Sequence, residues 1–386
     1  MAGIRRGPSP GATGRGPLLT TSWGHSRRLG RRWLWQPWSS DRGDEHANRP
    51  PSEAAHQPSN LEVNMKALTQ DRYGAADAME FRDVDMPEPS EGQVRVRVVA
   101  AGMDRGAWHF MTGEPYLMRV LGFGFRAPSV AVPGTNFAGV VEAVGPGVDT
   151  FKPGDEVYGA TRGTFAEYAV ASVEKIAPKP AQLTFEQAAV LPYPSFVALQ
   201  ALRDIGHVQP GQRVLIVGAS GAVGTVAVQL AVAFGATVTG VCSAKHAELV
   251  RSLGAGEVLD YSRDDFCDGS QRFDLIVDIG GRTPVGRLRR ALTPAGTLVM
   301  LGGEGDRWVG GIQRQLWASV LSVFVSQKLV AFVVKENAKE LLFVNELVAA
   351  GKVAPVVGPS FPLCDGAEAI ASFETGRASG RVVIVP

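Results

Sequence analysis

The sequence predicts an α/β protein that combines a partly open antiparallel β-barrel with a doubly wound parallel sheet. Over residues 65–185, short alternating strands separated by frequent Gly and Pro turns are typical of the barrel. Over residues 186–325, solid apolar runs alternate with helical stretches, which indicates the parallel sheet. The chain has 386 residues, 45% of them hydrophobic and 20% charged, so it is long enough to bury two cores.

The predicted elements follow the chain in order. MKALTQ, from Met65, is the first strand, and QVRVRVVAAG, GVVEAVGPGV and GDEVYGATRGTFAEYAVA supply further strands of the barrel. The strands of the parallel sheet are RVLIVGA, TVTGVCS, DLIVDIG and TLVMLGG, with TVAVQLAVAFG and AKHAELVRSLG as helices between them. Residues 326–386 return to a mixed character and end in RVVIVP, a strand that we expect to rejoin the barrel.

Residues 1–64 differ in composition from the rest of the chain. They hold nine arginines, no lysine and four of the seven tryptophans, Trp23, Trp33, Trp35 and Trp38. We predict a disordered extension or non-native upstream sequence; the alternative is an organelle transit peptide, which has a similar Arg- and Ser-rich composition. The other 322 residues carry 30 basic and 33 acidic side chains, which indicates no basic face for nucleic acid.

Two further features bear on the cellular setting. Cys242, Cys267 and Cys364 are widely spaced, so neither a disulfide framework nor a clustered metal site is indicated. We expect a cytoplasmic protein, or an organelle protein if the N-terminal extension is a genuine transit peptide. The most apolar run, LWASVLSVFVSQKLVAFVV, is interrupted by Gln327 and Lys328, which favours a buried helix followed by a strand over a membrane span.

A glycine-rich turn joins the strand RVLIVGA to the helix TVAVQLAVAFG. It is a variant of the dinucleotide fingerprint in which Ala219 stands at the usual first glycine. Gly221 lets the backbone approach a pyrophosphate, and Gly224 lets the helix pack tightly on the strand. The strand–turn–helix context favours nucleotide binding over an ordinary tight turn, and the predicted cofactor-binding residues are Ala219, Ser220, Gly221, Ala222, Val223 and Gly224.

The end of the next strand distinguishes NADP from NAD. An NAD site places an acid there for the ribose hydroxyls, whereas TVTGVCSAKHAEL offers Ser243 and Lys245 and no acid before Glu248. A hydroxyl and an ammonium suit a 2′-phosphate. The alternative is that Lys245 is a solvated residue at a helix start. On the basis of Ser243 and Lys245 we predict NADP(H) as the cofactor, and we expect Tyr261 to lie near the adenosine.

From Met65 to Pro386 the chain resembles the medium-chain dehydrogenase/reductase superfamily, in its zinc-free quinone oxidoreductase-like branch. The resemblance rests on the fingerprint and on AAGMDRGAWHFMTGEPY, VPGTNFAGVVEAVGPGVDTFKPGDEVYG, GTFAEYAVA and AAVLPYPSFVALQALRD. It implies a GroES-like barrel domain, in two parts over 65–185 and 326–386, around a Rossmann domain over 186–325. The active site is expected in the cleft between them.

The resemblance also bears on zinc. Zinc-dependent members hold the catalytic metal at three positions that match Asp104, Thr135 and Pro192, and one carboxylate cannot supply three ligands. No cysteine precedes Cys242, so the loop of the structural zinc is missing as well. His109, His207 and His246 follow the extension without metal spacing. The sequence therefore predicts no bound metal.

Without zinc there is no Lewis acid to activate an alcohol, whereas a conjugated acceptor needs only hydrogen-bond donors. We predict an NADPH-dependent reductase of quinones or α,β-unsaturated carbonyls. The alternatives are an NADP-dependent alcohol or carbonyl dehydrogenase and a cofactor-binding sensor or structural protein with little turnover.

The resemblance suggests which residues line the cleft. Tyr193 is the candidate catalytic phenol, and Asp104 and Trp108 are candidate substrate-pocket residues, with core packing as the alternative for Trp108 and Tyr193 and a structural role favoured for Asp104. Val197 replaces a threonine that relatives use near the nicotinamide ribose. The apolar loop between Met111 and Ala131 indicates a hydrophobic acceptor. Together with the missing zinc, this predicts a small hydrophobic, electrophilic substrate. The family suggests a homodimer through the 316–334 segment.

Overall fold

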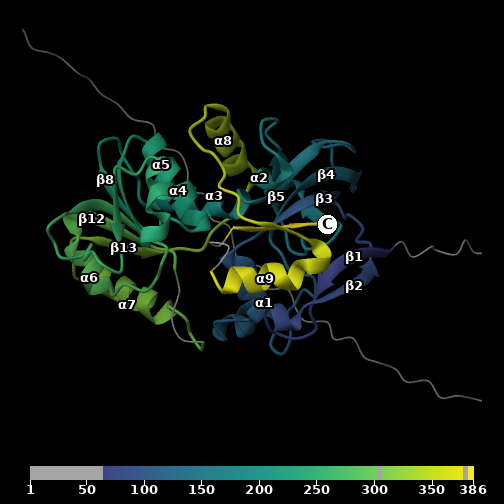
Figure 1. Ribbon diagram of the computed structural model, residues 1–386, viewed down its shortest axis with the longest axis horizontal. Helices are drawn as coiled ribbons and strands as arrows, with labels where there is room; N and C mark the ends of the chain where they lie inside the picture. Colours follow the sequence, from purple (N-terminus) through teal and green to yellow (C-terminus); the bar gives the residue numbers. More distant parts are fainter. Residues whose placement is uncertain (1–63, 303–306, 377–380) are drawn as a thin grey trace, which may run out of the picture. The chain divides into compact units, whose positions relative to one another are not determined.

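The computed structural model describes residues 64–302, 307–376 and 381–386. Within these residues it contains a two-stranded ribbon, a seven-stranded sheet and a six-stranded parallel sheet (Figure 1). The mixed α/β architecture predicted from the sequence is confirmed. The predicted N-terminal extension lies outside the described residues up to position 63, and its last residue, Asn64, begins the first strand.

In the part of the chain that the structure describes, the barrel region has nine strands. Strands β1 and β2 form the antiparallel ribbon, and the larger sheet has the order β14-β15-β3-β4-β5-β7, with β6 paired to β3. The C-terminal strand β15 pairs with β3, as the sequence predicted. The strand bounds are β1 (Asn64–Thr69), β2 (Glu80–Asp85), β3 (Gln93–Met103), β4 (Asn136–Val144), β5 (Glu156–Ala160), β6 (Tyr168–Ser172), β7 (Ile176–Pro178), β14 (Ser360–Pro362) and β15 (Val382–Val385).

The second sheet is parallel throughout, in the order β10-β9-β8-β11-β12-β13. Its direction of winding reverses between β8 and β11, and ligands of such sheets bind at the carboxyl ends of the strands around that point. The sheet extends past residue 325, because its last strand begins at Lys328. The strand bounds are β8 (Arg213–Val217), β9 (Thr237–Cys242), β10 (Glu257–Asp260), β11 (Phe273–Asp278), β12 (Leu292–Met300) and β13 (Lys328–Ala331).

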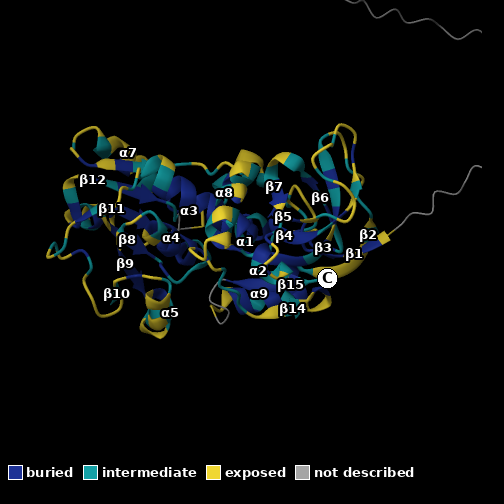
Figure 2. Ribbon diagram, turned by 90° about the horizontal axis from the view of Figure 1, so that it is seen from above, coloured by how far each residue is buried: buried dark blue, intermediate teal, exposed yellow. Residues whose placement is uncertain are grey.

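Helices connect and cover the two sheets. Helices α3 and α4 pack on each other, and most of their residues are buried, as the dark blue parts of these ribbons in Figure 2 show. The helix bounds are α1 (Arg105–Thr112), α2 (Phe185–Ala189), α3 (Pro192–Leu199), α4 (Ala222–Ala233), α5 (Ala247–Ser252), α6 (Val285–Arg290), α7 (Ile312–Ser322), α8 (Ala338–Ala349) and α9 (Gly366–Glu374). Shorter 3-10 and π turns lie at 76–78, 119–123, 173–175, 200–205, 244–246 and 363–365.

The apolar segment around residue 320 forms a helix and then a strand, α7 and β13, as expected. The expectation that the helix is buried was wrong. Leu316, Trp317 and Val320 are all more than half exposed, because only one narrow side of α7, around Ala318, packs on the sheet. No helix among the described residues is long and apolar enough to cross a membrane.

Candidate active site

The glycine-rich turn after β8 has the geometry of a phosphate-binding turn. Gly218 has a φ of +91°, a conformation that favours glycine, and Gly221 caps α4. A Cβ on Gly224 would collide with the carbonyl oxygen of Gly218 and with the backbone of Ala219, so only glycine permits this contact between helix and turn. The first backbone N–H groups of α4 are thereby placed at the carboxyl end of the sheet, where they can receive an anion.

A cavity of about 650 Å³ lies against this turn. Five of the predicted cofactor-binding residues line it, namely Ser220, Gly221, Ser243, Lys245 and Tyr261. The other four do not line the cavity. Ala219 and Gly224 are buried, and Ala222 and Val223 belong to the first turn of α4. The loops after β8 and β9, which were assigned to one cofactor site from their sequence patterns, thus line the same cavity.

The cavity also has a basic wall that sequence reasoning missed. Arg282 and Arg287 reach it from the segment after β11, and Arg105 from the start of α1. Arg287 forms an ion pair with Asp265. The run GGRTPVGRLRR could have indicated this wall, because it follows the parallel strand β11, and the carboxyl ends of parallel strands lie at one edge of a sheet.

Arg381 approaches the same turn from the last segment of the chain. Its Nη1 donates to the carbonyl oxygen of Ser220 over 2.6 Å, although 161 positions separate the two residues. The side chain is buried, which lowers the pKa of Arg381, and its Nε has no hydrogen-bond partner among the described residues. No local pattern in the sequence indicated this contact.

His246 stands beside the predicted 2′-phosphate residues. Its Nδ1 lies 3.2 Å from the Oγ of Ser243, and the ring lines the cavity. Burial lowers the pKa of His246, and the positive charges of Lys245 and Arg381 lower it further. This corner of the cavity is therefore electropositive and can become more so by protonation.

Two of the three positions that match zinc ligands in related enzymes, Asp104 and Thr135, are in contact. The Oγ1 of Thr135 lies 3.4 Å from both carboxylate oxygens of Asp104, and Pro192 begins α3 next to Tyr193. Pro192 has no side-chain donor, and hydroxyl and amide neighbours do not complete the site. The residues that the structure describes contain no cluster of three or more His, Cys, Asp or Glu side chains able to hold a metal.

Asp104 has a structural task at this point. Its Oδ1 accepts a 2.8 Å hydrogen bond from the backbone N–H of Ala107 and so caps α1. Its Oδ2 accepts a 2.6 Å hydrogen bond from the amide of Asn136. Burial raises the pKa of Asp104, while these hydrogen bonds act in the opposite direction.

Tyr193 lies on the first turn of α3, against the first turn of α1. A Cβ on Gly106 would stand 3.6 Å from Cε1 and 3.7 Å from Cζ of its ring. Burial raises the pKa of Tyr193, and the negative charges of Asp104 and Glu336 raise it further, so the phenol is protonated at neutral pH. Within the described residues no hydrogen bond engages the hydroxyl group, which leaves it available as a donor. Val197 is buried on the same helix.

Trp108 is positioned toward α9. Its indole Nε1 donates to Glu374 over 3.1 Å, and the ring stacks with the guanidinium of Arg105 at 4.9 Å. The ring packs against the core of the barrel. His109 makes a 2.6 Å hydrogen bond through Nδ1 to the carbonyl oxygen of Glu114. These contacts give both side chains a structural role. That Trp108 also contacts the substrate stays a prediction.

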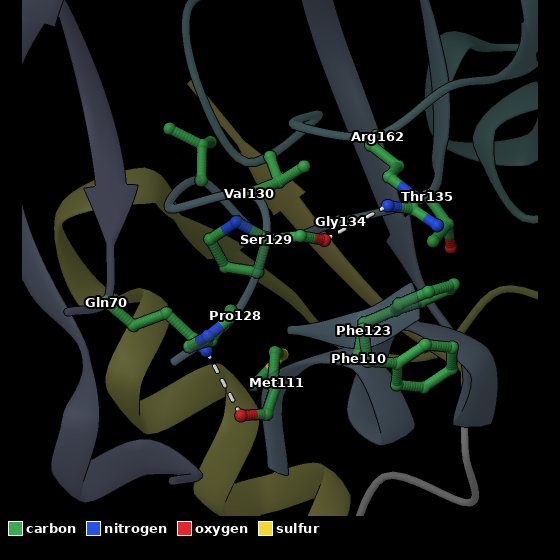
Figure 3. Close-up of a pocket in the computed structure, with 12 residues that line it drawn as sticks. Gln70, Phe110, Met111, Phe123, Pro128, Ser129, Val130, Gly134, Thr135 and Arg162 are labelled. Carbon is green, nitrogen blue, oxygen red and sulfur yellow. Dashed lines mark hydrogen bonds between the residues drawn. The ribbon is translucent and has the colours of Figure 1, made fainter. Parts of the chain in front are cut away.

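A second, small pocket of about 20 Å³ opens beside Thr135 (Figure 3). Phe110 and Phe123 stack 4.2 Å apart on one side, and the guanidinium of Arg162 lies over the ring of Phe110. Residues of the loop between Met111 and Ala131 form a wall of this pocket: Phe123, Pro128, Ser129 and Val130. The loop that the sequence marked as apolar therefore does line a pocket next to the cluster of Asp104 and Thr135.

Comparisons with known proteins agree with this geometry. Residues 90–181 match the family model described as the alcohol dehydrogenase GroES-like domain, and residues 253–384 match the one described as zinc-binding dehydrogenase. The chain is 32% identical to the 2-methylene-furan-3-one reductase of Solanum lycopersicum, over 83% of this chain and 79% of that protein.

Two further relatives extend the comparison. The chain is 31% identical to the NADPH-dependent alkenal/one oxidoreductase, chloroplastic, of Arabidopsis thaliana, over 83% of this chain and 80% of that protein. It superposes on the quinone oxidoreductase of Coxiella burnetii with a TM-score of 0.74 and 27% identity, over 84% of this chain and all of that one. The family resemblance and the fold predicted from the sequence are thus confirmed.

Proposed function

The chain belongs to the medium-chain dehydrogenase/reductase superfamily, in its quinone oxidoreductase-like branch, and from this premise we propose that it is a zinc-independent, NADPH-dependent reductase of quinones or α,β-unsaturated carbonyls. The observation that carries the proposal is the set of groups at the former ligand positions. Asp104 is in contact with Thr135, and Pro192 directly precedes Tyr193, whose phenol is protonated. Among the described residues no cluster of metal-binding side chains completes a site.

The cavity after β8 fits a nicotinamide dinucleotide, which supplies the hydride when it is bound. Gly221 and the start of α4 offer N–H groups to the pyrophosphate. Ser243 and Lys245 lie at the end of β9, where an NAD enzyme has a carboxylate, and their hydroxyl and ammonium groups favour a 2′-phosphate. Support for NADP also comes from the name of the Arabidopsis relative.

The acceptor is a molecule that spreads negative charge over a conjugated system. Hydrogen-bond donors suffice to stabilise that charge, each contributing about 3 kcal/mol in a site that excludes water. We assign this role to the phenol of Tyr193. The proton that completes the reduction comes from the phenol or from water, and the phenol is restored by exchange with solvent.

The test is turnover of the full chain in the presence of a chelator, with NADPH or NADH as donor and with a simple quinone and a simple enone as acceptors. We expect oxidation of NADPH that the chelator does not diminish. Faster turnover with NADH would contradict the assignment of Lys245. Binding of NADPH without turnover of any acceptor would favour a sensor or structural role, and oxidation of alcohols with NADP would favour an alcohol dehydrogenase.

We also propose that the chain forms a homodimer through β13 and α7. Strand β13 is the edge of the parallel sheet, and α7 exposes Leu316, Trp317 and Val320 beside it. Sedimentation of the chain and of Trp317→Asp tests this, with a dimer expected only for the unmodified chain. A cytoplasmic location stays our proposal, and localisation of a tagged full-length chain distinguishes it from an organelle.

A further inference from the structure

We infer that Asn136 is a positioning residue that holds Asp104 and Tyr193 as one unit. The inference rests on the proposed function, because it concerns the phenol to which we assign the stabilisation of the reduced acceptor. Asn136 begins β4 and makes hydrogen bonds both to Asp104, the N-cap residue of α1, and to Tyr193 in the first turn of α3.

The side chain of Asn136 is 1% exposed and makes three hydrogen bonds. Its Oδ1 accepts from the backbone N–H of Tyr193 over 2.8 Å. Its Nδ2 donates to Oδ2 of Asp104 over 2.6 Å and to Oγ1 of Thr135 over 3.2 Å. The partners fix the orientation of the amide, because a backbone N–H can only donate and a carboxylate can only accept.

The contact with Tyr193 anchors the start of α3. The first backbone N–H groups of a helix have no acceptor within the helix, and that of Tyr193 uses Asn136 in its place. On the other side, the tyrosine ring rests on Gly106, in the turn of α1 that Asp104 caps. Asn136 therefore sets both the backbone from which the phenol projects and the surface against which the ring lies.

The contact between Asp104 and Asn136 requires one carboxylate, which accepts the hydrogen bond, and one amide, which donates it. An aspartate at position 136 would place a second carboxylate at hydrogen-bond distance from Asp104, and like charges that close cannot both be stable. An asparagine at position 104 would face the NH2 group of Asn136 with no anion to receive it. Exchange of the two residues restores one acceptor and one donor, and the new carboxylate at 136 can still accept from the N–H of Tyr193.

This exchange gives a direct test. The full chain is compared with Asn136→Asp, Asp104→Asn and the double variant D104N/N136D, by kcat and KM for an enone under saturating NADPH. We expect each single variant to lose about 10²-fold in kcat with little change in KM, because a small displacement of a reacting group has that effect. The double variant should recover to within about tenfold of the unmodified chain.

A matched control is Asn345→Asp. Asn345 also accepts from a tyrosine, the hydroxyl of Tyr158, and donates to the carbonyl oxygen of Pro178, and it lies on α8. We expect kcat within about twofold of the unmodified chain, since no contact joins this residue to Asp104. A double variant no better than the worse single variant, or single variants with full kcat, would overturn the inference.

A second measurement is independent of turnover. With tyrosine labelled at Cζ, the NMR signal of Tyr193 is assigned by its loss in Tyr193→Phe. The signal should move in both single variants and return toward its original position in D104N/N136D, and an unmoved signal in the single variants contradicts the role of Asn136. If the unmodified chain reduces no acceptor, the proposed function fails, while the NMR comparison still decides the role of Asn136.

Discussion

Arg381 donates a 2.6 Å hydrogen bond to the carbonyl oxygen of Ser220, and this contact joins the residue directly before β15 to the nucleotide turn. The guanidinium is buried, so its charge acts with little screening. We predict that Arg381→Met weakens NADPH binding about tenfold or more, the size expected for the loss of a charged hydrogen bond near a phosphate. Calorimetric titration with NADPH measures this. Arg263→Met, at an exposed position on the loop after β10, should leave the affinity unchanged.

Lys245 should decide between the two cofactors. Lys245→Ala removes the ammonium group that faces the proposed 2′-phosphate, so KM for NADPH should rise at least tenfold while KM for NADH changes little. The ratio of kcat/KM for the two cofactors is the measurement. Lys352→Ala, an exposed lysine beyond α8, is the control. Equal effects on both cofactors would remove the assignment of the 2′-phosphate to this corner.

His246 should make NADPH binding depend on pH. The pKa of His246 is lowered by burial, by Lys245 and by Arg381, so the ring is neutral at pH 7 in the free protein. A 2′-phosphate beside it favours the protonated ring, so NADPH affinity should rise as the pH falls below about 6.5, whereas NADH affinity should not. Calorimetric titrations at a series of pH values check this.

The free protein should show the opposite trend in stability. A histidine whose folded pKa is below its unfolded pKa disfavours folding when protonated, so its contribution is complete above about 6.5 and is lost as the pH falls. In His246→Gln, both the NADPH affinity and the stability of the free protein should depend less on pH. A pH dependence of NADPH binding that persists in this variant would have another origin.

Tyr193→Phe removes the proposed donor and keeps the ring. We predict a loss of about 10²- to 10³-fold in kcat, with an unchanged dissociation constant for NADPH, because loss of one donor to a developing negative charge has effects of this size. Stopped-flow measurement of hydride transfer isolates the chemical step. Tyr168→Phe, on β6 in the barrel, serves as the comparison and should react at the rate of the unmodified chain. Full activity in Tyr193→Phe would assign the stabilisation to other groups.

Gly224 should tolerate no side chain. A Cβ added at this position would collide with the carbonyl oxygen of Gly218, so Gly224→Ala should destabilise the fold by about 1–3 kcal/mol and abolish NADPH binding. Gly286→Ala is the matched control, because Gly286 is also in a helix, α6, and a Cβ there would meet nothing within 4 Å. That variant should be as stable as the unmodified chain or gain up to about 1 kcal/mol. Thermal unfolding compares the two.

Much of the fold could be predicted because its signals are local. The alternation of Val94, Val96 and Val98 with polar residues marks a strand with one buried face, and the run from Arg213 to Gly224 marks a strand, a turn and a helix. The exposure of α7 was not predictable in the same way. Apolar residues such as Trp317 look the same in sequence whether a core or a second protein covers them.

The sequence by itself determined the fold class, the nucleotide turn and the residues at the former zinc positions, because each depends on residue type and short spacing. Only the tertiary structure decided which distant groups meet: Arg381 with Ser220, and Asn136 with Asp104 and Tyr193. Such contacts join segments separated by tens to more than a hundred positions. Their energy comes from burial and from paired polar groups, which depend on the packing of the whole chain and leave no periodic trace in the sequence.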